Sequence, residues 1–201
     1  PMLFALAFFF NFLVGGISGV FLSDVPADTT EHGSFFVMAH FHYTIMGGLV
    51  FAFFAATYYW LPKMLGFTLH EGLAKIHFWL MFVFFNLTFF PLFAAGFVGM
   101  PRRVSTYAPG LQPLNDFVSA SAYVLGFSML IFLANLVYSL VFARVPAPDN
   151  PWESKSIEWQ LPTPVPVLAA VVTAELEGLV EDDADASPPD PPDPDDEARA
   201  S

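Results

Sequence analysis

The chain has 201 residues, of which 55% are hydrophobic and 17% aromatic, including 25 Phe, and its mean hydropathy is +0.56. These values indicate an integral membrane protein that does not bind nucleic acid, and the absence of Cys excludes disulfides, zinc–thiolate sites, iron–sulfur clusters and thiol catalysis. From Glu175 onward eleven acids and one base supply −10 of the net charge of −12, so the charge describes the end of the chain and not an acidic partner-binding surface.

Four apolar segments are long enough to cross the hydrocarbon core of a bilayer, which takes roughly 20 helical residues. They cover residues 2–22, 35–61, 73–98 and 114–142. The loops between them contain charged residues, Pro and Gly. The sequence therefore predicts an all-α, polytopic membrane bundle whose four transmembrane helices occupy a core of residues 1–144.

Two further regions follow the last span. Residues 145–174 form a Pro-rich segment, whose apolar patch at 165–174 has about half the length that a span needs. Residues 175–201 are rich in Asp and Pro without an aromatic residue, which predicts a disordered acidic tail. Because the chain begins with Pro directly in an apolar run, we expect it to be the downstream part of a longer protein.

Basic residues near the ends of the spans indicate the orientation. Lys63 lies in the second loop and Arg144 follows the last span, so the positive-inside rule places this loop and the C-terminal tail in the cytoplasm. Arg102 and Arg103 then lie outside, against the rule. An anionic group there would account for them, and both haem propionates and lipid phosphates suit the planar guanidinium group.

His40 and His42 lie near the start of the second span. Successive helical residues turn by about 100°, so these two imidazoles point to nearly opposite sides and cannot share one metal ion. They could serve two cofactors that flank one helix, since imidazole is a common ligand of haem iron. The alternative is that both are structural histidines of the core or of the headgroup region.

Several sequence runs, in order and at matching spacing, resemble subunit I of the haem–copper terminal oxidases. They are HGSFFVMAHFHY (32–43), YYWLPK (58–63), AKIHF (74–78), NLTFFP (86–91), GMPRR (99–103), NPWE (150–153) and IEW (157–159). The resemblance covers roughly residues 1–166. It implies that the four spans are the last four of a twelve-helix subunit.

The resemblance also implies two haems, of A type or related, and a copper ion (CuB) whose ligands lie on earlier helices. His40 would bind the iron of the high-spin haem and His42 that of the low-spin haem, with Phe41 between the two haem edges. Arg102 and Arg103 would contact the haem propionates.

The resemblance assigns the position of His32 to a Mg or Mn site. The family usually has an acidic or amide residue next, whereas this chain has Gly33, which has no side chain to coordinate a metal. The alternative is that His32 hydrogen-bonds a propionate or water.

The expected function is that of the C-terminal part of a respiratory oxidase subunit that reduces oxygen to water and pumps protons in the plasma membrane of a prokaryote. The fragment alone is not expected to be active. Expected partners are the upstream helices, subunits II and III, membrane lipid and an electron donor: cytochrome c, a blue copper protein or quinol. The alternatives are a nitric oxide reductase-like member of the superfamily and a non-enzymatic four-helix protein for electron transfer or assembly.

Overall fold

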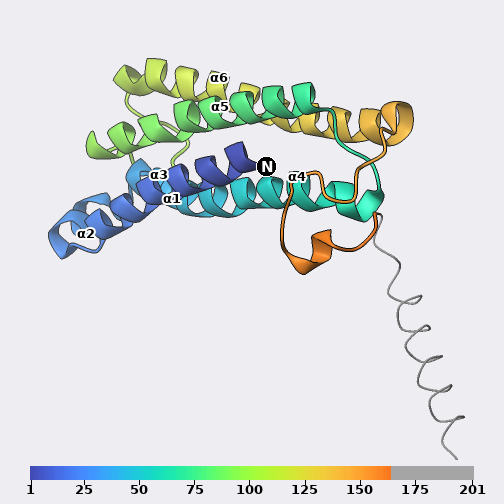
Figure 1. Ribbon diagram of the computed structural model, residues 1–201. Helices are drawn as coiled ribbons and strands as arrows, with labels where there is room; N and C mark the ends of the chain where they lie inside the picture. The colour runs from blue at the N-terminus through green and yellow to red at the C-terminus, as the bar shows by residue number, and fades with distance from the viewer. Residues whose placement is uncertain (164–201) are drawn as a thin grey trace, which may run out of the picture. The chain divides into compact units, whose positions relative to one another are not determined.

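The structure is a computed structural model that describes residues 1–163, and within this range it is helical without a named strand (Figure 1). Four helical segments are long and apolar enough to cross a membrane, as the sequence predicted. The elements in chain order are α1 (Met2–Leu22), α2 (Val25–Glu31), α3 (Phe35–Thr44), η1 (Ile45–Val50), α4 (Phe51–Leu65), α5 (Glu71–Phe97), η2 (Pro109–Leu111), α6 (Gln112–Val137), η3 (Tyr138–Ala143) and η4 (Ile157–Trp159).

The apolar patch at 165–174 and the acidic tail at 175–201 lie outside the described residues. The division of the chain at residues 144 and 174 therefore stays a prediction. The first loop, by contrast, is described and contains the short helix α2, which the sequence reading did not anticipate. Asp24 precedes it and Pro26 lies in its first turn, both common at helix starts.

The second span is one continuous helical segment, Phe35–Leu65, made of α3, η1 and α4. It extends one turn beyond the predicted end at residue 61, with Pro62 inside the helix. Proline is tolerated in membrane helices because neighbouring groups can satisfy the freed backbone carbonyl. The helix ends at Gly66, whose φ of 77° is the left-handed conformation that commonly terminates a helix.

The π-helical turn η1 interrupts this span where it packs against α1. Gly47 and Gly48 are buried there, and a Cβ at Gly47 would lie only 2.8 Å from the Cβ of Asn11. Small residues let membrane helices approach to backbone contact, which increases their van der Waals packing. Helix α1 therefore lies directly against the second span.

The spans form two antiparallel pairs: α1 lies along α3 and α4, and α5 lies along α6 (Figure 1). The buried core between them is mostly aromatic, and Phe4 of α1 meets Phe78 of α5 edge to face at 5.0 Å between ring centroids. Other large apolar side chains point outward, such as Phe9 at 69% exposure. Such surfaces suit contact with lipid or with further helices.

Backbone hydrogen bonds join the loops at each end of the bundle. At one end Phe35 N donates to Met100 O and Arg102 N donates to Gly33 O, both at 2.9 Å. At the other end Thr68 N donates to the Val145 carbonyl at 2.9 Å. The first and third loops thus share one end, and the second loop shares the other with the segment after α6, which is the alternation that four successive spans require.

Lys63 fastens the post-helix segment to the end of α4. Its side chain is only 2% exposed, and its Nζ donates to Asp149 O at 3.2 Å, to Thr163 Oγ1 at 3.0 Å and to Leu161 O. The ammonium also lies 5.5 Å from the ring centroid of Trp159. A buried ammonium needs such compensation, so these contacts order residues 149–163 against the bundle.

Candidate functional site

The helix that carries the two histidines begins at a capped N-terminus. The Ser34 hydroxyl accepts a hydrogen bond from Phe36 N at 3.1 Å and donates to Glu31 Oε2 at 2.7 Å, and both polar side chains are buried. An N-cap satisfies one of the free amides of the first turn. Together with the bond from Phe35 N to Met100 O, this cap fixes where α3 starts.

His40 faces α1. Its Nδ1 lies 3.0 Å from the carbonyl oxygen of Gly15 and 2.9 Å from the Ser18 hydroxyl. A Cβ at Gly19 would lie 3.0 Å from the Cε1 of this imidazole, so α1 presents a small-residue face to the ring.

His42 faces α5. Its Nδ1 lies 2.7 Å from the carbonyl oxygen of Met38, one turn earlier in the same helix. Its ring stacks on Phe89 of α5 at 4.2 Å between centroids and 15° between planes. The ring of Phe41 also lies 4.2 Å from the His42 ring, between centroids. The two imidazoles therefore contact different neighbouring helices, as the helical spacing predicted.

Both imidazoles are in a state that suits metal binding. A carbonyl oxygen can only accept, so in each ring Nδ1 is the hydrogen-bond donor and Nε2 is the nitrogen left for a metal ion. No described residue hydrogen-bonds either Nε2. Metal-bound histidines usually donate their second N–H to a carbonyl or carboxylate, which orients the ring. The donor set thus fits two haem irons, one on each side of α3.

Arg102 and Arg103 lie in the loop that is hydrogen-bonded to the start of α3. Neither guanidinium has a carboxylate within ion-pair distance among residues 1–163. Arg103 has a φ of 63°, a left-handed conformation that is costly for an L-residue with a long side chain. The loop therefore presents two positive charges that no carboxylate of residues 1–163 compensates, at the end of the bundle where the histidine-bearing helix α3 begins.

His32 lies apart from the other histidines, at the C-terminal end of α2. Its Nδ1 is 3.2 Å from Asp28 Oδ1, and both side chains are largely exposed, at 74% and 42%. Residues 1–163 contain no group of three His, Asp or Glu side chains that could hold a metal ion. This part of the chain alone thus offers two candidate ligands, His32 and Asp28.

The remaining histidines lie toward the opposite end. His70 caps α5 by accepting from Leu73 N at 3.3 Å. His77 is fully buried, and its Nδ1 lies 3.1 Å from the Tyr58 hydroxyl. These contacts agree with a structural role for His77.

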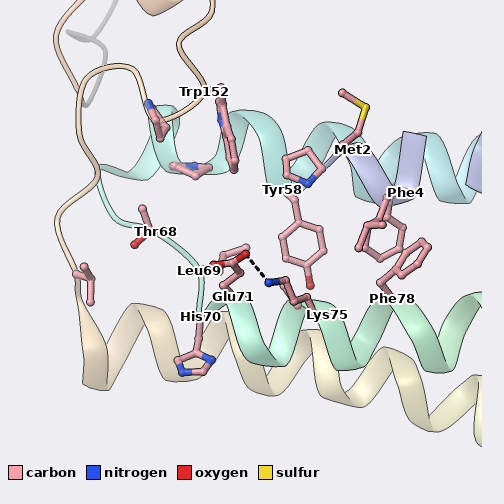
Figure 2. Close-up of a pocket in the computed structure, with 16 residues that line it drawn as sticks. Met2, Phe4, Tyr58, Thr68, Leu69, His70, Glu71, Lys75, Phe78 and Trp152 are labelled. Carbon is pink, nitrogen blue, oxygen red and sulfur yellow. Dashed lines mark ion pairs between the residues drawn. The ribbon is translucent and has the colours of Figure 1, made fainter. Parts of the chain in front are cut away.

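A pocket of about 660 Å³ opens at this opposite end, lined by residues of α1, α4, α5 and the post-helix segment. Figure 2 shows the ion pair between Glu71 and Lys75 of α5, whose charged atoms are 2.8 Å apart, and Tyr58 of α4 among the side chains that line the pocket. Neither His40 nor His42 lines this pocket.

Sequence reading did not identify the residues that hold the two rings. Gly15, Ser18 and Gly19 support His40, and Phe89 supports His42. The small residues at spacings of three and four in the first span carry a signal, because this spacing places them on one helical face. Phe89 carried no such signal, because nothing in the sequence pattern distinguishes it from the other Phe residues of a chain that has 25.

The family model for cytochrome c and quinol oxidase polypeptide I matches residues 1–124. The chain is 43% identical over 163 residues to cytochrome c oxidase subunit 1 of Synechocystis sp., and 39% identical over 169 residues to quinol oxidase subunit 1 of Bacillus spizizenii. These matches cover 81% and 83% of this chain but only 29% and 26% of the relatives.

A solved structure has a similar fold. It is a haem–copper terminal oxidase dimer determined by cryo-EM, with a TM-score of 0.62 and 22% sequence identity over 69% of this chain and 26% of that one. The likeness confirms the predicted membrane helical fold. The match to the family model, which spans more than half of the chain, and the extensive identity to its relatives confirm the resemblance in the sequence: the chain belongs to the cytochrome c and quinol oxidase polypeptide I family.

Proposed function

We propose that this chain is the C-terminal part of the catalytic subunit of a terminal oxidase that reduces oxygen to water and pumps protons. In this proposal His40 holds the iron of the high-spin haem and His42 that of the low-spin haem. The observation that carries it is the pair of oppositely directed imidazoles in one membrane helix, each with Nδ1 bound to an oxygen acceptor and with no hydrogen bond to Nε2 from residues 1–163. Bound haem would supply iron centres for electron transfer and for oxygen binding.

The chain's own residues then have separate tasks. The carbonyls of Gly15 and Met38 orient the two rings and increase the basicity of each Nε2. Phe41 lies between the histidines in the same turn of α3, and we assign its apolar ring to the space between the two haems that would be bound. Arg102 and Arg103 would compensate the propionate charges, which suit the planar guanidinium group.

Other parts of the oxidase would complete the centre. Upstream helices would supply the copper ligands, and subunits II and III and the electron donor would bind outside this chain. A Mg or Mn ion at His32 and Asp28 would need further ligands from elsewhere, because Gly33 supplies none. Both cytochrome c and quinol oxidases are among the relatives at similar identity, so similarity alone does not single out the donor.

The orientation follows from the charges at the two ends. We place the end that carries Lys63, Lys75 and Arg144 in the cytoplasm, according to the positive-inside rule, in the plasma membrane of a prokaryote. The arginine pair then lies at the outer end, where we assign the propionates.

The test is to replace each histidine in the complete oxidase and to record the spectra of both haems. His42→Ala should remove the low-spin haem signal, and His40→Ala should disturb the haem that binds carbon monoxide. His70→Asn is the matched control, because Asn can still cap α5. Loss of the same haem in both alanine variants, or of neither haem, would contradict the assignment.

A further inference from the structure

Three polar atoms form a closed triangle at the face of α1 that meets His40. The His40 Nδ1 lies 2.9 Å from Ser18 Oγ and 3.0 Å from Gly15 O, and the Ser18 hydroxyl lies 2.9 Å from the same carbonyl. Ser18 is only 7% exposed. The Ser18 hydroxyl therefore contacts both the backbone of α1 and the imidazole of His40.

The proton positions in this triangle follow from the acceptors. Gly15 O can only accept, so the Ser18 hydroxyl donates to it and His40 Nδ1–H points toward both oxygens. A hydroxyl that donates to a carbonyl becomes a better acceptor, because hydrogen bonds in a chain polarise one another. His40 Nδ1–H thus has two acceptors, whereas His42 Nδ1–H has Met38 O alone.

The backbones of α1 and α3 are so close at this point that a Cβ at position 15 or 19 of α1 would crowd α3. A Cβ at Gly15 would lie 2.8 Å from Thr44 Cγ2 and 2.9 Å from Thr44 N, and one at Gly19 would press against the His40 ring at 3.0 Å from Cε1. The absence of both Cβ atoms lets the carbonyl and the hydroxyl reach the imidazole.

We propose that Gly15, Ser18 and Gly19 form a positioning site for His40, in which the Ser18 hydroxyl sets the electron donation of this ligand and Gly19 sets the angle of its ring. The inference rests on the proposed role of His40 as an iron ligand. Ser18 and Gly19 touch neither iron nor oxygen and act through the imidazole.

The direction of the effect follows from the hydrogen bonds. Each acceptor at Nδ1–H makes Nε2 more basic, and a more basic ligand favours the more positively charged, oxidised iron. Removal of the Ser18 hydroxyl leaves one acceptor of two. The midpoint potential of the haem bound by His40 should then rise, and its iron–histidine bond should weaken.

The first experiment uses Ser18→Ala in the complete oxidase, with redox titration of both haems and resonance Raman spectroscopy of the reduced enzyme. We expect a higher midpoint and a lower iron–histidine stretching frequency for the high-spin haem, with the low-spin haem unchanged. Ser18→Thr should restore both values, because it keeps the hydroxyl and its methyl group can enter the adjoining apolar groove of about 350 Å³.

Ser128→Ala is the matched control. Ser128 is fully buried in α6 and donates to a backbone carbonyl three residues earlier, at 2.6 Å, as Ser18 does, but within residues 1–163 no hydrogen bond joins it to a histidine. A Ser18→Ala enzyme with both values unchanged overturns the inference and leaves the haem assignment intact. A shift confined to the low-spin haem instead overturns the assignment of His40.

The second experiment keeps the hydroxyl and changes the shape of the site. Gly19→Ala places a methyl group against the His40 ring and should alter the same stretching frequency. Gly126→Ala in α6 adds a methyl group with no atom within 4 Å in residues 1–163 and should leave it unchanged. Equal frequencies in the two variants would refute the role of Gly19.

Discussion

Gly96 of α5 packs against Phe36 at the start of α3, at the end of the bundle near the loop that carries Arg102 and Arg103. A Cβ at this position would lie 2.3 Å from Phe36 N, 2.5 Å from Phe36 Cβ and 2.7 Å from Phe36 Cα. Two of these three atoms belong to the backbone of α3, so no side-chain rotation relieves the overlap. Gly96→Ala should therefore separate α5 from the helix that carries both histidines.

The magnitude follows from the distances. Ordinary van der Waals contact begins at 3.4 Å, so the two backbones must move apart by about 1.1 Å. Overpacking of this kind costs about 1–3 kcal/mol, and we expect the upper end because both sides are rigid. Alanine recovers about 0.5–1 kcal/mol of intrinsic helix preference. The net loss should be about 2 kcal/mol, or roughly 30-fold in the equilibrium constant of folding.

The assay compares Gly96→Ala with Gly126→Ala, which shares the gain in helix preference but has open space in the described residues. In the purified complete oxidase we expect Gly96→Ala to lose haem absorbance at a lower temperature and to contain less haem per protein. If both variants retain haem to the temperature of the unmodified enzyme, the close contact between α3 and α5 is wrong.

Three further outcomes are expected in the complete oxidase. Replacing Arg102 or Arg103 with Gln should lower the haem midpoint potentials in a redox titration, because an uncompensated propionate favours oxidised iron, and Lys should restore them only in part; unchanged midpoints would favour lipid phosphates as partners. Lys63→Met should expose residues 149–163 to limited proteolysis, since it leaves carbonyls without their donor; an unaltered digestion pattern would contradict this contact. Phe89→Ala should change the electron paramagnetic resonance of the low-spin haem, whereas the exposed Phe90→Ala should not; identical spectra would refute the support of His42.

The sequence predicted the spans well because lipid contact requires long apolar helices. The first span coincides with Met2–Leu22, and α5 begins two residues earlier and ends one residue earlier than predicted. The π-helical turn at Ile45–Val50 could not be predicted from hydropathy, because it reflects the approach of α1 to Gly47 and Gly48. Helix α2 was missed because its seven residues are too short and too polar to show an apolar stripe.

The site was predictable only where side-chain direction follows from helical spacing. The opposite facing of His40 and His42 is a property of one helix and required no tertiary information. The partners of His40 come from residues 22 to 25 positions earlier, and Phe89 follows His42 by 47 positions, so these contacts depend on how the helices pack. The position of the loop that carries Arg102 and Arg103 likewise depends on tertiary contacts, such as the hydrogen bond from Arg102 N to Gly33 O.

The buried Lys63 also has a consequence for the order of events during synthesis. Its carbonyl partner in Leu161 lies 98 residues later, which a ribosome adding about 5–20 residues per second needs roughly 5–20 s to reach. Until residue 149 is made, the ammonium at the end of α4 lacks the carbonyl and hydroxyl partners that it has in the structure, while the two remaining spans are synthesised. Closure of residues 149–163 over Lys63 is therefore among the last contacts of the described chain to form, and translation that stops before residue 149 leaves Lys63 without these three partners.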